Sequence, residues 1–305
     1  MKKKDLVLYL DWTPNINHIG FFIAKDLGFY EDLGIRINIL DPSTDNYKIT
    51  PAKKVELGES DFALCPFESV ISYRTKSKPF DLIAIAAVLQ KDLSAIAVKN
   101  KAITSPKFLD NKTYASYGAR YEDLIIKQMI INDGGNGTIN IKYPNKLGIW
   151  ETVIKDKYDS TWIFLNWEGI EAKGKNITLN YFKMSDFNIP YSYSPVVVGS
   201  EKLLYENKEL VKKFLLATRK GFLFSLSDKI KSVDILSQYI PDYEKEVNLT
   251  DALEETAEAF IDNNVWGKIN DSNVKIFFNW LLKNNIIDLN FNYKKLFTNN
   301  FLTHL

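Results

Sequence analysis

The sequence predicts an α/β protein built from two lobes that close on a ligand, with helices in its C-terminal part. Strand-like and helix-like segments alternate from the N-terminus, the alternation restarts after residue 111, and residues 202–283 show helical periodicity. Such alternation indicates a parallel sheet with helices on both faces. A chain of 305 residues is long enough for two such units.

The first unit follows from short apolar runs separated by helical stretches. Pro66 opens a helix at a first-turn position, where its missing N–H has no cost, and Gly34 and Gly58 each stand where a helix ends. Right-handed connections place the carboxyl ends of the strands at one edge, where α/β proteins bind ligands. We predict strands at 6–10, 36–40, 61–65 and 80–88, with helices at 18–32, 50–57 and 66–74.

The second unit repeats this order, and a Gly-Gly-Asn-Gly run at 134–137 ends one of its helices. Apolar runs at 94–98 and 195–199 are interpreted as the crossings between units. The expected lobes are residues 1–93 with 198–305, and residues 94–197, with the ligand in the cleft between them. The second unit has predicted strands at 112–116, 139–142, 161–165 and 177–182, and helices at 120–132 and 146–155.

Composition and charge disfavour several classes of function. The formal net charge of +1 and the scattered aromatic residues argue against nucleic-acid binding. Cys65 is the one cysteine, so no intrachain disulfide can form, and with only His18 and His304 beside it we expect no metal site. No apolar stretch is long enough to span a bilayer, so we expect no direct membrane insertion.

The N-terminus carries lysines but neither an apolar signal region nor a small-residue cleavage site. The expected location is therefore cytoplasmic for the chain as written, and periplasmic or cell-surface if an export signal was removed before numbering. We expect a monomer or a weak dimer.

The segment 10–24 carries the first functional signal. The strand at 6–10 runs into Asp11 and Trp12, a turn with Pro14 and Asn15 follows, and His18 opens the next helix. A strand end beside a helix start brings a flat aromatic surface, a carboxylate acceptor and backbone donors to one sheet edge. This combination predicts a site for a flat, polar heterocycle.

Five motifs occur in order over roughly residues 5 to 225: Asp11-Trp12-Thr13-Pro14-Asn15 with Asn17-His18, Gly28-Phe29-Tyr30, Gly58-Glu59-Ser60-Asp61-Phe62, Trp167-Glu168-Gly169-Ile170 and Pro195-Val196-Val197-Val198. Together they resemble the thiamine-pyrimidine family, which spans formylaminopyrimidine-binding proteins of bacterial ABC importers and cytosolic thiamine-pyrimidine synthases of fungi. The resemblance implies the type II periplasmic-binding-protein fold.

The resemblance also implies different chemistry in the two branches. A synthase of this family builds the pyrimidine from pyridoxal phosphate and one of its own histidines, with a lysine that holds the aldehyde and a cysteine-rich, iron-binding run. In an ungapped match Cys65 stands in place of the lysine and Ser69 in place of the histidine, and the cysteine-rich run falls near 191–195, which holds no cysteine. Without the lysine no Schiff base forms, and without the cysteines no thiolate iron site forms.

Candidate ligand contacts in the first lobe are side chains at strand ends and helix starts. Trp12 would stack on a pyrimidine ring or pack in the core. Asp11 would accept from an exocyclic amine or cap the turn.

The helix start at 66–69 suits a carboxylate, formyl or phosphate oxygen, while Glu68 could accept from an aminopyrimidine or cap its helix. Asn15 and His18 would bond ring nitrogens, although His18 could equally be a helix-start residue. Cys65 is interpreted as a small buried apolar residue. The set is Asp11, Trp12, Asn15, His18, Glu68 and Ser69.

The second lobe and the return crossing supply the other candidates. Arg120 would pair with an anionic substituent or lie on the surface near Glu122 or Asp123. Trp167 would stack while Glu168 accepts from an N–C–NH₂ edge and favours ring protonation; the alternative is a packed tryptophan and an exposed glutamate. Tyr191 and Tyr193 line the cleft or pack at the crossing. The set is Tyr117, Gly118, Arg120, Trp167, Glu168, Tyr191 and Tyr193.

These features predict a ligand-binding protein of the ABC-importer type for an aminopyrimidine precursor of thiamine, with no cofactor and no catalysis of its own. In that role its partner would be an ABC permease. Two alternatives stay open: a cytosolic pyrimidine synthase of divergent chemistry with His18 as reactant, and a cytosolic sensor or carrier of the same ligand. The missing export signal favours the synthase, and the missing lysine and cysteines disfavour it.

Overall fold

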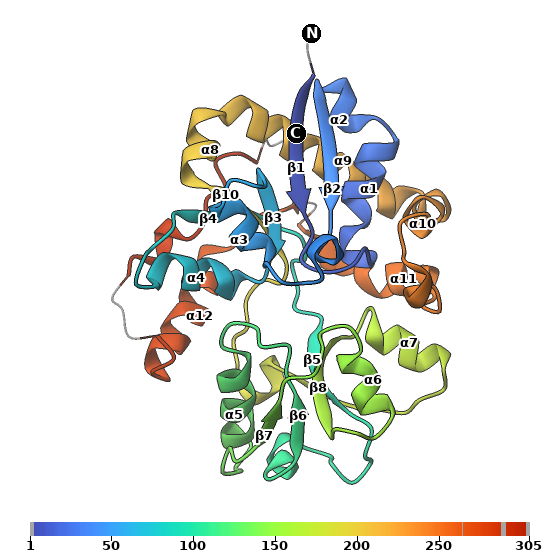
Figure 1. Cartoon of the computed structure of the whole chain (residues 1–305), viewed down its shortest axis with the longest axis vertical. Helices are drawn as coiled ribbons and strands as arrows, with labels where there is room; N and C mark the ends of the chain where they lie inside the picture. The colour runs from blue at the N-terminus through green and yellow to red at the C-terminus, as the bar shows by residue number, and fades with distance from the viewer. Residues whose placement is uncertain (1–2, 264, 288–290, 303–305) are drawn as a thin grey trace.

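A computed structural model describes residues 3–263, 265–287 and 291–302 and shows two lobes, each built around its own sheet (Figure 1). The sheet of the first lobe, at the top of Figure 1, has the order β2-β1-β3-β10-β4, and that of the second lobe has the order β7-β6-β8-β5-β9. The chain crosses to the second sheet between β4 and β5 and returns between β9 and β10. The predicted two-lobed α/β architecture is confirmed.

The first sheet consists of β1 Lys4–Tyr9, β2 Ile35–Leu40, β3 Phe62–Cys65, β4 Leu82–Ala87 and β10 Val196–Ser200. The helices that precede the crossing are α1 Ile19–Asp26, α2 Phe29–Asp32, α3 Pro51–Glu56 and α4 Phe67–Thr75. After the return come α8 Glu201–Glu206, α9 Lys208–Ser227, α10 Lys229–Ser237, α11 Leu249–Phe260 and α12 Asp271–Lys283, with a hairpin of β11 Ile261–Asp262 and β12 Val265–Trp266.

The second sheet consists of β5 Ser94–Val98, β6 Thr113–Ala115, β7 Asn140–Lys142, β8 Ser160–Phe164 and β9 Asn180–Lys183. Its helices are α5 Glu122–Asn132, α6 Ile149–Ile154 and α7 Glu168–Gly174. Short 3₁₀ turns occur at Ile16–His18, Pro42–Asp45, Pro106–Leu109, Ser185–Phe187, Asp242–Glu244 and Tyr293–Lys295.

Both sheets are mixed rather than fully parallel, which corrects one expectation. In the first sheet β1 pairs in parallel with β2 and β3, but β10 lies antiparallel between β3 and β4. The reason is the route of the chain: it re-enters the first lobe from the ligand edge, so β10 starts where β3 ends, with Val196 opposite Cys65. In the second sheet β5 is likewise antiparallel to β8 and β9.

Two predicted helical segments are interrupted. The helix expected at 18–32 is divided into α1 and α2, because Gly28 adopts a left-handed conformation with φ of 78° that an α-helix cannot contain. The C-terminal helical region contains the β11–β12 hairpin, whose Trp266 is fully buried in the first-lobe core. A short hairpin has no periodic signal strong enough to stand out between two long amphipathic helices.

The first crossing lies between β4, which ends at Ala87, and β5, which begins at Ser94, and β10 spans Val196–Ser200 after the return. The lobe boundaries given above stay a prediction. Within the described residues, no helix combines the length and the apolarity needed to cross a membrane.

The first-lobe core depends on a close crossing of α1 and α9. Phe21, Phe22 and Phe222 are buried there, and Phe21 contacts Phe222 edge to face at 5.3 Å. A Cβ placed on Gly221 would lie 1.9 Å from the carbonyl oxygen of Gly20. Only glycine lets the two helix backbones approach this closely.

We therefore expect Gly221→Ala to lower the free energy of unfolding by roughly 1–3 kcal/mol, since the added methyl group forces the helices apart. Urea titration measures this change. Gly174→Ala in α7 is the matched control, because a Cβ there meets no atom within 4 Å. Equal stability of the two variants would contradict the close crossing.

Candidate ligand-binding cleft

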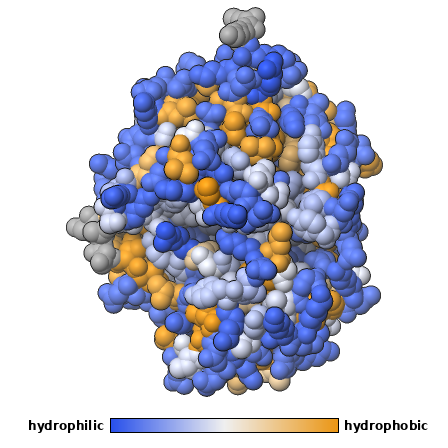
Figure 2. Space-filling view, viewed as in Figure 1, coloured by the Kyte–Doolittle hydropathy of each residue, from blue (hydrophilic) through white to orange (hydrophobic). Residues whose placement is uncertain are grey.

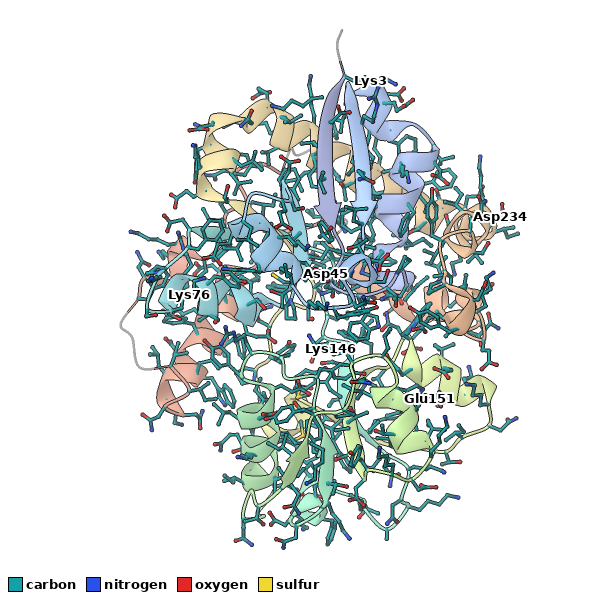
Figure 3. All side chains as sticks on the ribbon, in the orientation of Figure 1. Lys3, Asp45, Lys76, Lys146, Glu151 and Asp234 are labelled. Carbon is teal, nitrogen blue, oxygen red and sulfur yellow. The ribbon has the colours of Figure 1, made fainter. Side chains whose placement is uncertain are left out.

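A cleft of about 400 Å³ lies between the lobes and is lined by residues of both. Figure 2 shows a recess between the lobes, and Figure 3 places Asp45 and Lys146 on opposite sides of the gap. The volume lies within the range of small-molecule sites. The predicted site residues that line it are Asp11, Trp12, Asn15, Glu68, Ser69, Tyr117, Gly118, Arg120, Trp167, Glu168 and Tyr191.

His18 and Tyr193 do not line the cleft. His18 is 1% exposed and lies behind the end of β1, where its Nδ1 accepts from the backbone N–H of Asn15 at 3.1 Å. Its proton is therefore on Nε2, which donates to Asp11 Oδ1 at 2.8 Å. His18 thus orients the Asp11 carboxylate at the cleft. The Tyr193 hydroxyl accepts from Asn270 N at 3.0 Å and packs in the core.

Trp12 forms an aromatic contact across the two lobes. Its ring centroid lies 5.0 Å from that of Tyr47 in the first lobe and 5.6 Å from that of Tyr117 in the second. Both tyrosines also line the cleft. The half-buried indole therefore combines a tyrosine neighbour in each lobe with exposure to the ligand space.

Glu68 is a buried carboxyl group at the start of α4. It follows β3 directly and is 4% exposed. The Tyr191 hydroxyl lies 2.8 Å from Oε1 and 3.0 Å from Oε2, so it donates to this carboxylate. Burial raises the pKa of Glu68 to about 8. Tyr191 also contacts Trp162 at 5.1 Å, which closes this side of the cleft with aromatic rings.

Glu168 occupies the corresponding position at the start of α7 in the second lobe. Its Oε2 accepts from the backbone N–H of Phe164 at 2.9 Å, and burial raises the pKa of this carboxyl to about 7. Trp167 is 3% exposed and its Nε1 donates to Glu244 at 3.0 Å. The tryptophan is therefore packed between the lobes while it also lines the cleft.

Neither Glu68 nor Glu168 forms an ion pair with a lysine or arginine within the described residues. The two carboxyl groups therefore have acceptor capacity that the described chain leaves unused. Each accepts a hydrogen bond from another residue, and a donor on a ligand can add a further bond that offsets the cost of desolvating the carboxyl group.

A third glutamate, Glu122, turns inward at the start of α5. Its carboxylate accepts from the Tyr114 hydroxyl at 2.7 Å and from the backbone N–H groups of Tyr117 at 3.1 Å and Ala119 at 3.0 Å. The loop before α5 is thus wrapped around this carboxylate, and burial raises the pKa of Glu122. Arg120 is exposed at the rim instead of pairing with Glu122 or Asp123.

Cys65 and Ser69 line the cleft at the end of β3 and the start of α4. Cys65 is 4% exposed, and burial raises the pKa of its thiol, so it remains protonated at neutral pH. The described residues contain no cluster of three or more His, Cys, Asp or Glu side chains that could hold a metal ion.

Sequence reasoning missed several lining residues. Trp162 follows the alternation of its strand, and Glu122 stands at a predicted helix start, so a signal existed for both. Tyr47 lies on a connection that carries no periodicity, so nothing in the sequence marked it, whereas Lys146 stands at the start of the helix predicted at 146–155. The missed cleft residues include Asn17, Tyr47, Tyr73, Glu122, Lys146 and Trp162.

The two five-stranded sheets, joined by two crossings around a central cleft, define the periplasmic-binding-protein fold. A solved protein of Candida albicans, CA3427, described as exhibiting the generic periplasmic binding protein structural fold, superimposes with a TM-score of 0.72 at 15% identity. The match covers 100% of this chain and 98% of that one. At such low identity the likeness concerns the fold alone.

A model of the family described as NMT1/THI5 like matches residues 15–229, and the chain belongs to this family. A formylaminopyrimidine-binding protein of Halalkalibacterium halodurans is 22% identical over 74% of this chain and 68% of its own length. A 4-amino-5-hydroxymethyl-2-methylpyrimidine phosphate synthase of Legionella pneumophila is 24% identical over 78% of this chain and 75% of its own. The resemblance found in the motifs is confirmed.

The raised pKa of Glu68 predicts a pH-dependent stability. The group holds its proton more tightly when folded than when unfolded, so its stabilising contribution is complete below about pH 4.5 and is lost as the pH rises toward 8. We expect Glu68→Gln to be more stable relative to the wild type at pH 8 than at pH 5, by about 3 kcal/mol.

Urea unfolding at both pH values measures this difference. Glu206→Gln, on the exposed surface of α8, is the control and should show the same difference from the wild type at both pH values. Glu68→Gln and wild-type stabilities that change in parallel with pH would show that Glu68 is not desolvated.

Proposed function

We propose that this protein binds a thiamine-pyrimidine precursor, an aminopyrimidine, as the substrate-binding component of an ABC importer. One observation carries the proposal: two desolvated carboxyl groups, Glu68 from the first lobe and Glu168 from the second, face one aromatic cleft without a cationic partner among the described residues. The fold and the relatives support a ligand-binding role, and the choice of ligand rests on this chemistry.

An aminopyrimidine meets both requirements of the cleft. Its amino group and an adjacent protonated ring nitrogen present two N–H donors on one edge, which match a carboxylate in a charge-assisted pair. A carboxylate beside the ring favours the protonated ring. Its faces offer a flat π surface to Trp12, Tyr47 and Trp162, and the partial exclusion of water strengthens the polar contacts.

The two relatives point to different roles for the same ring. One is named for binding formylaminopyrimidine and the other for making a hydroxymethylpyrimidine phosphate. The cleft supports the first, because Cys65 and Ser69 line it where the synthase resemblance places lysine and histidine. His18, the alternative reactant, is 1% exposed and is held by Asn15 and Asp11.

A direct assay separates the two roles. The chain is incubated with iron, pyridoxal phosphate and oxygen, and its mass is then measured. Loss of mass at a histidine with release of a pyrimidine phosphate would establish the synthase. An unchanged mass together with bound pyrimidine supports the binding protein. A cytosolic sensor of the same ligand would bind equally well, and a copurifying ABC permease distinguishes the importer from it.

A thermal-melt screen tests the ligand class. We expect hydroxymethylpyrimidine or formylaminopyrimidine to raise the melting temperature, because a ligand at 100 times its Kd adds about 2.7 kcal/mol of stability. Thiamine, pyridoxal phosphate and riboflavin are run in parallel. A shift with one of these three and none with either pyrimidine would replace the proposed ligand.

Calorimetry on a variant tests the site. Glu168→Gln should weaken aminopyrimidine binding by about tenfold to a hundredfold, since a charge-assisted bond becomes a neutral one. Glu254→Gln on the surface of α11 is the control and should bind like the wild type. Trp167→Ala is a poor test, because a tryptophan this buried contributes to the fold itself. Unchanged affinity in Glu168→Gln would place the ring elsewhere.

A further inference from the structure

Helix α5 of the second lobe begins beside the cleft, but the backbone N–H groups of the loop before it are not available to an anion. The loop 116–119 precedes α5, and three consecutive backbone N–H groups in it are already bonded within the chain. Those of Tyr117 and Ala119 donate to the Glu122 carboxylate, and that of Gly118 donates to Ser116 Oγ at 3.0 Å. The carboxylate thus occupies the position that a phosphate would take at such a helix start.

The side chains that line the cleft do not replace these occupied donors. Burial raises the pKa of Glu68 to about 8 and that of Glu168 to about 7, so it favours their neutral forms. Arg120 is exposed at the rim, so water and salt screen its charge. The lining side chains with a carboxyl group or a cation are Asp11, Glu68, Glu122, Glu168, Arg120 and Lys146.

We infer that the cleft selects unphosphorylated aminopyrimidines, neutral or cationic, and rejects their phosphate esters. This inference rests on the proposed function and narrows it to one substrate class. Glu122 is the specificity-determining residue, because its carboxyl oxygens occupy the loop N–H groups that would otherwise donate to an anion.

Isothermal titration calorimetry of the full chain tests the inference with 4-amino-5-hydroxymethyl-2-methylpyrimidine and with its phosphate ester. We expect the alcohol to bind at least about tenfold more tightly than the ester. Glu122→Gln should narrow this ratio by improving ester binding. Glu151→Gln, on α6 of the same lobe and outside the cleft lining, should leave the ratio unchanged.

A second measurement covers the case in which Glu122→Gln disturbs the loop. Inorganic phosphate at millimolar concentration is added to wild-type protein saturated with the alcohol, and we expect no displacement. Displacement by phosphate, or an ester that binds as tightly as the alcohol, overturns the inference and leaves the pyrimidine assignment intact. Failure of both pyrimidines to bind overturns the proposed function and the inference with it.

Discussion

The desolvation of carboxyl groups without matching cations is the constraint on which the chemistry of the cleft depends. Burial raises the pKa of Glu68 to about 8 and that of Glu168 to about 7, although each stands in the first turn of a helix. A helix N-terminus favours the ionised carboxylate, so the loss of water outweighs the helix dipole at both positions. Such groups add little to stability, which is a physical reason to assign them to a ligand.

The contacts between lobes determine how far apart the two carboxyl groups stand. Asn166, fully buried at the end of β8, donates to Asn17 Oδ1 at 2.8 Å and to Thr256 Oγ1 at 2.9 Å. The indole of Trp167 adds a bond to Glu244. Both contacts join the second lobe to the first, and Thr256 and Glu244 belong to its C-terminal part. The C-terminal helical region therefore provides part of the first-lobe surface that the second lobe contacts, and these contacts position the second lobe.

Much of the fold follows from the sequence because strand and helix periodicities are local properties. The position of β10 does not, since a strand's partners depend on the route of the whole chain, and this strand returns antiparallel between β3 and β4. The helix predicted at 18–32 is interrupted at Gly28 because the φ angle of this residue is 78°. A periodic pattern in the sequence does not reveal a single dihedral angle. The hairpin at β11 and β12 is too short to produce a pattern of its own.

The candidate site shows the same difference between residues that local sequence patterns predict and residues whose position depends on the tertiary structure. Asp11-Trp12 and Trp167-Glu168 could be predicted to face one cleft because each pair follows a strand end in its own lobe, and all four line the cleft. His18 could not be placed, because whether a helix-start histidine faces a ligand or a carboxylate behind it depends on the turn geometry around Asn15. Tyr47 comes from an irregular connection, whose course is a tertiary property. Lys146 opens the helix predicted at 146–155, but in the structure it lies on the loop before α6, which begins at Ile149.

Three glutamates in equivalent local positions show how environment separates their roles. Glu68, Glu122 and Glu168 each stand in the first turn of a helix that follows a strand, and burial raises the pKa of all three. Glu122 is satisfied by its own loop, through two backbone N–H groups and the hydroxyl of Tyr114. Glu68 has one tyrosine hydroxyl and Glu168 one backbone N–H from another residue. Under the proposed function, Glu68 and Glu168 contact the pyrimidine ring because they have few hydrogen-bond partners within the chain. Glu122 shapes the loop before α5, because its oxygens already accept hydrogen bonds from that loop.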